Sequence, residues 1–368
     1  MARPRENERT ITVVHIIPYD GIGGVEVAAR SLPAGDHPSP RGEVRVVKLF
    51  ISRRSGDKAE APHVWTGPRA SEWAPGNYLR AAAELYRRRP DLVIVSLWRS
   101  CIVALLAKIV MPRLRLVAFL HLAEAVHLPD RLLNALVMRL ATEIWADSDS
   151  TLARRLPARL RHKGRVISFL TERLERATQG PVAPRFVFWG RLHPQKGLDR
   201  ALDIFAALAA SRPDARFTII GPDMGSETAL NAQARALGVT DMVVFTGPMD
   251  RAAIFAHASE HHFYLQPSLT EGMAMSVVEA MQLGLIPVVA PVGEIPGYCR
   301  DGENALFVPR DVHAGQVAGR IASLLDAPDH AESMARAARA TWAEHALYRD
   351  DMLTACHSLL GPDGVTQR

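Results

Sequence analysis

The sequence predicts an α/β protein made of two doubly wound domains, each a parallel sheet covered by helices. Short apolar runs rich in β-branched residues alternate with longer Ala-, Leu- and Arg-rich segments, the pattern of repeated strand–helix units. The length of 368 residues favours two such domains. Residues 170–184 interrupt the alternation with one glycine and two prolines, and a new apolar run follows them. We therefore predict an N-terminal domain over residues 1–172 and a C-terminal domain over residues 184–345.

The predicted strands recur in both halves of the chain. In the first half they cover residues 11–17, 44–51, 92–97, 114–120, 143–146 and 166–169. In the second half they cover residues 186–189, 217–220, 243–245, 262–265, 286–289 and 305–308. A last helix at about residues 346–361 follows them, and we expect it to pack back on the first domain. Ligands of open α/β sheets bind beyond the carboxyl ends of the strands, so the loops after the strands should carry function.

The composition is that of a folded protein, and its positive charge suggests an anionic partner, although a high-GC genome would also enrich arginine and alanine. Hydrophobic residues make up 48% of the chain and charged residues 23%, which argues against a disordered protein. The formal charge is +5, and the cations suit a nucleotide, an anionic lipid surface or nucleic acid. No apolar run approaches the ~20 residues that span a bilayer, and the cysteines lack disulfide or metal spacing. We therefore expect a cytoplasmic protein without a membrane span.

Two glutamates after the strand at residues 262–265 give the strongest chemical signal. Glu271 lies in the loop at the end of that strand, and a helix beginning at residues 274–276 places Glu279 about one turn inside it. Both carboxylates can then accept hydrogen bonds from the hydroxyl groups of one sugar or ribose ligand. A phosphate would be attracted by the N–H groups at the start of the helix, those of Gly272, Met273, Ala274, Met275 and Ser276. Taken alone, the pair is equally well explained by a capping and a solvated glutamate.

Two cations follow the strand at residues 186–189. Arg191 and Lys196 come soon after it, and Gly197 opens a helix. A guanidinium binds a diphosphate through a bidentate fork, and an ammonium binds it as a point charge. The alternative is a surface arginine and a lysine before a helix N-terminus, where a cation is slightly unfavourable. That cost favours a functional role, so we predict that Arg191 and Lys196 neutralise a diphosphate.

Four motifs in this half are together typical of one protein family. They are GRLHPQKG at residues 190–197, TIIGPD at 218–223, VVFTG at 243–247 and PSLTEGMAMSVVEAMQLGLIPVVA at 267–290. With these motifs in this order, the sequence resembles the retaining glycosyltransferases of glycosyltransferase family 4, the group 1 transferases. The resemblance implies the GT-B fold, in which two Rossmann-like domains face each other across a cleft. It also implies a nucleoside diphosphate sugar as the donor.

The resemblance assigns expected roles to residues of the first domain. The segment GIGGVEVAAR resembles the family's glycine-rich loop, which implies that Gly23 and Gly24 approach the donor phosphate. His121, directly after a predicted strand, matches the position of the family's histidine near the transferred sugar. The aspartate that usually follows this histidine is Leu122 here. A carboxylate partner must therefore come from elsewhere, for example from Glu124.

Two charged segments of the first domain have alternative interpretations. Asp147-Ser148-Asp149 could hold a divalent metal that bridges a diphosphate, but its place at the start of a helix favours capping. We therefore expect no metal and no other cofactor. Residues 154–165 hold six cations and no acid, and Arg80 with residues 87–89 adds a second basic region. These cations would dock the domain peripherally on the inner face of the cell membrane, although a solvated helical face explains them equally well.

We therefore predict a retaining hexosyl- or glycosyltransferase that uses a nucleoside diphosphate sugar and a polysaccharide, lipid-linked or other glycan acceptor. Glu279 would hold the ribose, Glu271 a sugar hydroxyl, and Arg191 and Lys196 the leaving diphosphate, while His121 orients or polarises the sugar. The resemblance to the family also implies a role in the assembly of polysaccharides or lipid-linked oligosaccharides at the bacterial cell envelope. The alternatives are a sugar-nucleotide epimerase of similar fold, which needs no acceptor, and a basic nucleic-acid-binding protein. For the second, the sequence has charge but no binding module, so we expect no nucleic acid partner.

Overall fold

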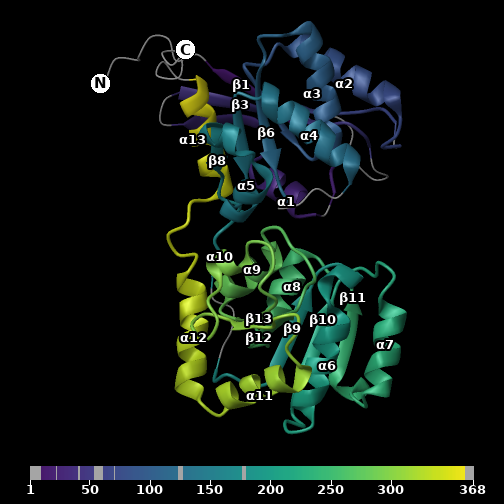
Figure 1. Cartoon of the computed structure of the whole chain (residues 1–368), viewed down its shortest axis with the longest axis vertical. Coiled ribbons are helices and arrows are strands. Elements are labelled where there is room, and N and C mark those ends of the chain that lie inside the picture. The colour runs from purple at the N-terminus through teal and green to yellow at the C-terminus, as the bar shows by residue number, and fades with distance from the viewer. Residues whose placement is uncertain are drawn as a thin grey trace. The chain divides into compact units, whose positions relative to one another are not determined.

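The chain forms two compact units in a computed structural model. One unit comprises Met1–Glu172 together with Ala346–Arg368, and the other comprises Arg173–His345. Each unit contains a largely parallel sheet with helices packed on it (Figure 1). The α/β fold class predicted from the sequence is therefore confirmed. The structure describes residues 10–21, 23–39, 42–53, 61–69, 71–122, 127–175 and 180–360.

The first unit is built on a sheet with the strand order β2-β3-β1-β5-β6-β7-β8, and β4 pairs with β3. Its strands are β1 (Ile11–Ile17), β2 (Gly35–Ser39), β3 (Gly42–Phe50), β4 (Val64–Thr66), β5 (Leu92–Ser96), β6 (Arg115–Leu120), β7 (Glu143–Ala146) and β8 (Gly164–Val166). Its helices are α1 (Gly24–Ser31), α2 (Pro75–Arg88), α3 (Trp98–Val110), α4 (Leu128–Leu140), α5 (Asp149–Arg155), the 3₁₀ helix η1 (Ala158–Lys163) and α13 (Tyr348–Leu360).

The second unit has the strand order β11-β10-β9-β12-β13-β14, and every pair in it is parallel. Its strands are β9 (Arg185–Trp189), β10 (Arg216–Ile220), β11 (Val243–Gly247), β12 (Phe263–Gln266), β13 (Ile286–Val289) and β14 (Leu306–Phe307). Its helices are η2 (Pro194–Lys196), α6 (Leu198–Ala209), α7 (Glu227–Ala236), η3 (Thr240–Met242), α8 (Arg251–Ala258), α9 (Met275–Leu283), α10 (Ile295–Tyr298), α11 (Ala314–Leu325) and α12 (Pro328–Ala340).

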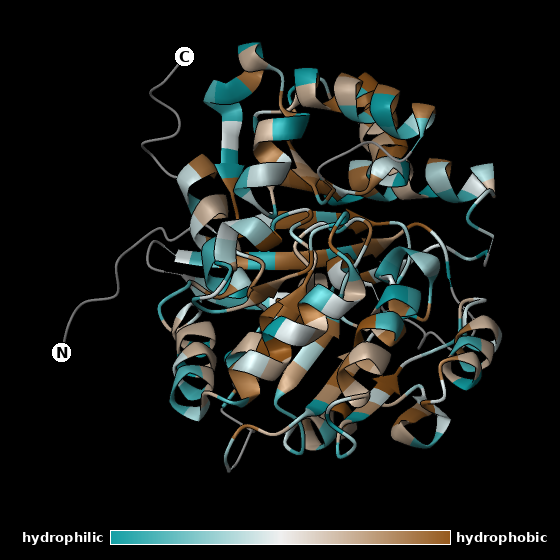
Figure 2. Cartoon of the chain, turned by 60° about the horizontal axis from the view of Figure 1, so that its bottom comes forward, coloured by the Kyte–Doolittle hydropathy of each residue, from teal (hydrophilic) through white to brown (hydrophobic). Residues whose placement is uncertain are grey.

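The central strands are buried because helices cover both faces of each sheet. β5 is buried along its whole length, and so is β13, which explains why these segments read as continuous apolar runs. Figure 2 shows the strands largely in brown between helices that mix brown with teal. In the first unit, α2, α3 and α4 cover one face of the sheet, and successive helices of this layer pack side by side. None of the helices within the described ranges is both long and apolar enough to cross a bilayer.

Three strands of the first unit differ from the sequence prediction. β2 was not predicted because its sequence, GDHPS, is poor in strand-forming residues, and it forms by antiparallel pairing with β3. β4 is only three residues long, and it too depends on its pairing with β3. The strand predicted at residues 166–169 ends at Val166, because Phe169 turns away to pack against Phe119 and Tyr348.

The segments that connect the two units are held by specific contacts. Arg173 lies in the region expected to be a linker, but its guanidinium donates hydrogen bonds to the carbonyl groups of Trp342, Ala343 and His345 in the second unit. After this point the chain returns to the first unit, where the Tyr348 N–H donates to the carbonyl of Leu170. Helix α13 therefore completes the first unit although it follows the second unit in sequence.

Candidate functional site

Two loops of the second unit meet at a glycine that has no room for a side chain. Gly197 follows η2 with a φ of +66°, and a Cβ atom built there would lie 2.2 Å from the carbonyl oxygen of Pro267. The Leu269 N–H donates to the Gln195 carbonyl at 2.8 Å, and the Gln195 side chain donates to the Thr270 carbonyl at 2.9 Å. The loop after β9 is thereby fixed against the loop after β12. This contact places Lys196 beside Glu271.

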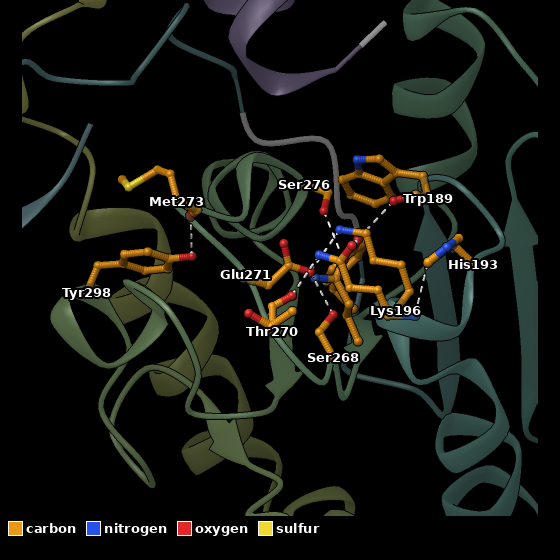
Figure 3. Close-up of polar contacts among 12 residues, drawn as sticks. Trp189, His193, Lys196, Ser268, Thr270, Glu271, Met273, Ser276 and Tyr298 are labelled. Atoms are coloured by element: carbon orange, nitrogen blue, oxygen red, sulfur yellow. Dashed lines mark hydrogen bonds and ion pairs between the residues drawn. The ribbon is translucent and has the colours of Figure 1, made fainter. Parts of the chain in front are cut away.

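Glu271 is the centre of a polar network (Figure 3). Its Oε1 atom accepts hydrogen bonds from Lys196 Nζ at 2.8 Å, Ser268 Oγ at 2.7 Å and Gln266 Nε2 at 3.0 Å. The side chains of Lys196 and Glu271 are only 14% and 7% exposed, so the ion pair is largely desolvated. Three donors on one oxygen hold this carboxylate in a single orientation. The sequence predicted both residues but assigned each to a ligand, whereas the structure pairs them with each other.

Gln266, the last residue of β12, carries the network towards α9. Its Oε1 atom accepts hydrogen bonds from the Tyr264 hydroxyl at 2.7 Å and from Ser276 Oγ at 2.9 Å. The Tyr264 hydroxyl also lies 3.1 Å from the carbonyl oxygen of Trp189, and burial raises the pKa of Tyr264 well above its usual value. Tyr264 therefore stays protonated and serves as a hydrogen-bond donor in this network.

Glu279 is held by a separate pair of donors. The Trp189 indole donates from Nε1 to Glu279 Oε2 at 2.9 Å, and Arg251 forms an ion pair with Oε1, also at 2.9 Å. Helix α9 begins at Met275, so Glu279 lies about one turn inside it, as the spacing predicts. Its carboxylate is fixed by these two contacts, and a side-chain exposure of 13% leaves it accessible at one edge.

The N–H groups at the start of α9 form the next part of the site. Across the described residues, the N–H groups of Gly272 to Ser276 donate no hydrogen bond. The loop is anchored through its carbonyl groups instead, because Gly272 accepts from the Glu294 N–H at 3.0 Å and Met273 accepts from the Tyr298 hydroxyl at 2.8 Å. Ala274 adopts a left-handed conformation, with φ of 54° and ψ of 63°, which is strained for a residue with a side chain. The arrangement suits an anion.

Arg191 lies in the turn directly after β9, and it is exposed. Its guanidinium has no ion pair or hydrogen bond with any other residue that the structure describes. The charge is therefore available to an anion from solution. The second unit thus brings together most of the predicted donor-site residues on the loops after β9 and β12 and at the start of α9.

Gly23 and Gly24 lie at the start of α1 in the first unit. Gly23 is the N-cap residue of the helix, and a Cβ atom there would lie 2.5 Å from a carboxylate oxygen of the buried Glu26. Because that atom is the end of a flexible side chain, the contact alone does not require glycine at this position. Contact with a donor phosphate stays a prediction.

His121, directly after β6, is buried and neutral. Burial lowers its pKa to about 3, and its ring packs on Phe119 with ring centroids 4.3 Å apart. Its Nε2 atom lies 2.9 Å from Ser96 Oγ, and the same hydroxyl lies 2.8 Å from Nε2 of His15. The Nδ1 atom of His121 has no hydrogen-bond partner among the described residues. Glu124, considered above as a partner, lies outside the described residues.

The sequence did not predict His15, Ser96 or Lys48 as candidate functional residues. All three lie within buried strands, and Lys48 is the register partner of His15 across β3 and β1. Burial lowers the pKa of Lys48 to about 7, and its ammonium donates no hydrogen bond to any described residue. The signal that could have revealed these residues is a single polar residue inside an otherwise apolar run, as in VVHII at residues 13–17.

Ser148, between the two aspartates considered as metal ligands, is the N-cap of α5. Its Oγ atom accepts a hydrogen bond from the Thr151 N–H, and Asp149 lies in the first turn. The capping residue is therefore Ser148 and not, as the sequence predicted, one of the two aspartates. Ser148 also donates to Asp147 Oδ1 at 3.1 Å. Within the described ranges, no three His, Cys, Asp or Glu residues form a group suited to a metal ion.

The leucines of the basic segment face inward. Leu156 belongs to the core of the first unit, and Leu152 and Leu160 pack against that core. The segment forms the end of α5 and η1 rather than one amphipathic helix, as Pro157 between them requires. Residues 154–165 therefore offer charge, but no apolar side, to a membrane.

Comparison with known proteins shows what the second unit and the whole fold resemble. Residues 176–341 match the family described as "Glycosyl transferases group 1". The D-inositol 3-phosphate glycosyltransferase of Acidothermus cellulolyticus is 36% identical over 171 residues, which cover 42% of this chain and 37% of that protein. The enzyme of the same name from Mycolicibacterium smegmatis is 34% identical over 164 residues, 42% of this chain and 36% of that protein. The chain thus matches little more than a third of the length of these curated relatives.

Solved structures extend the likeness to both units. Anabaena Alr3699/HepE in complex with UDP has a TM-score of 0.74 at 17% identity, and the match covers 97% of this chain and 100% of that one. The lipopolysaccharide outer core galactosyltransferase WaaB has a TM-score of 0.72 at 16% identity, over 95% of this chain and 99% of that one. At these identities the likeness establishes the fold, which is GT-B. The second unit is similar to the group 1 glycosyltransferases over residues 176–341.

Proposed function

We propose that the protein transfers a sugar from a nucleoside diphosphate donor to a glycan or lipid-linked acceptor, with retention of anomeric configuration. The observation that carries the proposal is the arrangement around α9. The largely buried Lys196–Glu271 pair joins the loops after β9 and β12. The N–H groups of Gly272 to Ser276, which have no partner among the described residues, lie at the start of α9. Two structures of HepE, which has the same fold, support the donor class, because they contain UDP and UDP-glucose.

Each group of the site has a task in this reaction. The N–H groups at the start of α9 and the exposed Arg191 would bind the diphosphate, whose negative charge grows as the sugar bond breaks. Lys196 would turn from Glu271 to the diphosphate or share its hydrogen bonds between them. Glu271 would accept a hydroxyl of the sugar, and Glu279 a hydroxyl of the ribose. The neutral imidazole of His121 would contact the sugar by a hydrogen bond rather than by charge.

Donor binding is tested on the full chain by thermal unfolding with a panel of nucleoside diphosphates and their sugars. A donor at about 100 times its dissociation constant should stabilise the fold by about 2.7 kcal/mol. Glu279→Gln should reduce the shift, because a carboxylate that accepts from the ribose is lost, whereas the exposed Glu260→Gln should not. If no nucleotide shifts the unfolding temperature, the proposal fails.

Transfer is tested by incubating the bound donor with and without candidate acceptors and resolving the products by NMR. A product with the anomeric configuration of the donor supports retention, and an inverted product contradicts it. If the donor were epimerised in the absence of acceptor, the protein would instead be a sugar-nucleotide epimerase.

We also propose that Arg191 and Lys196 take the place of a metal in balancing the leaving group. Turnover should then be unchanged in EDTA. If EDTA abolished turnover and Mg²⁺ or Mn²⁺ restored it, a metal held by Asp147 and Asp149 would balance the leaving group instead.

A further inference from the structure

Helix α4 exposes a row of leucines. Leu128, Leu132, Leu136 and Leu140 are between 64% and 43% exposed, and their spacing of four places them along one side of the helix. The opposite side is buried and packs into the core of the first unit through Val137 and Met138. Apolar side chains grouped in this way on a surface mark an interaction site.

The neighbouring helices continue this apolar surface. α3 packs beside α4, and α2 packs beside α3. Each helix precedes the next parallel strand of the sheet, so the three helices run in the same direction and their C-terminal ends lie at one edge of the layer. At that edge α3 exposes Ile109 (78%) and Val110, and α2 exposes Tyr86. We name the exposed side of these three helices the α2–α4 face.

The charges on the α2–α4 face are all positive. The exposed charged residues of the three helices are Arg80, Arg87, Arg131 and Arg139. Their acids face inward: Glu84 pairs with Arg87 and with the half-buried Arg88, and Asp130 is buried and pairs with Arg155 of α5. Arginine near the C-terminal end of a helix also stabilises the helix dipole, but that effect does not explain the exposed leucines.

We propose that the α2–α4 face docks on an anionic phospholipid bilayer. Leucine side chains would enter the boundary between headgroups and acyl chains while the arginines contact lipid phosphates, as in amphipathic helices that lie in a membrane surface. A second copy of the chain fits less well, because a two-fold contact would set arginine against arginine with no exposed acid on these helices to pair with it. The inference depends on exposed side chains alone, so it can fail without the proposed transfer reaction failing.

Flotation of the full chain with vesicles tests the docking. We expect binding to vesicles of phosphatidylcholine with 30% phosphatidylglycerol and little binding to phosphatidylcholine alone. Arg131→Gln and Arg139→Gln should each weaken binding about fivefold, the effect of one cation near an anionic surface. Leu132→Ser with Leu136→Ser should weaken it about tenfold or more, because the apolar insertion is lost. Since these side chains are exposed, the circular dichroism and unfolding temperature of the variants should match those of the wild type.

Matched changes on the second unit provide the control. Met224→Ser with Leu237→Ser also removes two exposed apolar side chains, and binding should not change. Equal binding to neutral and anionic vesicles, or unchanged binding of the leucine and arginine variants, would overturn the proposal. So would a wild-type dimer in light scattering that the leucine variants dissociate, because that result would make the face an interface between proteins.

Discussion

Two groups of buried polar residues, one in each unit, differ in how fully their hydrogen bonds are satisfied. In the second unit, Glu271 and Gln266 each accept from several donors, and their side-chain contacts form one connected network. In the first unit, Lys48 and His121 are equally buried, yet each has a nitrogen atom without a hydrogen-bond partner among the described residues. A satisfied network fixes geometry at little cost, whereas an unpartnered buried group lowers stability. The comparison indicates a preformed site in the second unit and polar groups kept at a cost in the first.

The largest effect should come from removing Lys196. If it stabilises the leaving diphosphate, Lys196→Ala should lower kcat by about 10²- to 10³-fold, the loss typical of one stabilising donor. Stability should also fall, because Glu271 loses one of its three donors. Unfolding and turnover of Lys196→Ala and of Lys196→Ala/Glu271→Gln separate the two effects. The second change should restore stability without restoring turnover, and unaltered turnover in the single variant would remove Lys196 from the reaction.

The next largest effect should come from the contact between the two loops. Gly197→Ala should lower the free energy of unfolding by about 2–5 kcal/mol, since it adds a side chain at positive φ and against the Pro267 carbonyl. Gly238 is the matched control, with a φ of +72° and open space around it, and Gly238→Ala should cost only about 1–2 kcal/mol. Denaturant unfolding measures both. Equal costs would mean that the loops do not depend on this contact.

Lys48→Met should raise the free energy of unfolding, whereas the changes above lower it. We expect the first unit to gain about 2–4 kcal/mol at pH 7, because the variant replaces a buried cation with a methionine of similar length. Between pH 7 and pH 10 the unfolded chain keeps a proton on Lys48 that the folded chain has lost, so wild-type stability rises with pH in this window. The advantage of the variant should therefore shrink from pH 7 to pH 9. Unfolding curves at both values test this, and a destabilised variant would show that the ammonium has a partner.

The smallest effect should come from Ser96→Ala. The variant leaves Nε2 of both His15 and His121 without the shared hydroxyl, and we expect a loss of about 1–3 kcal/mol in stability. ¹⁵N NMR of the imidazole nitrogens should show a changed tautomer population for His121, which a purely steric role of Ser96 would not produce. Ser96→Thr retains the hydroxyl and should keep the wild-type spectrum.

The sequence predicted most strands and the residues around α9, because both depend on local patterns. Parallel strands appear as apolar runs, and the interval between Glu271 and Glu279 fixes their place on the helix. The Lys196–Glu271 pair was not predicted, because it depends on contact between residues 75 positions apart in the chain. The same holds for Ser96, which lies between two histidines from different strands. β2 escaped prediction because its pairing with β3, and not its own residues, makes it a strand.

Helix α13 has a consequence for the order in which the protein forms. Tyr348 stacks parallel to the ring of Phe119, and the Ser168 N–H donates to Asp351. Part of the first unit's core therefore cannot form until the residues of α13 have been synthesised. The second unit is encoded by one continuous stretch, residues 173–345. During synthesis on the ribosome, the second unit can therefore complete its core while the first, although translated earlier, still lacks its closing helix. Until that helix emerges, Phe119 lacks the ring of Tyr348 that covers it in the folded unit.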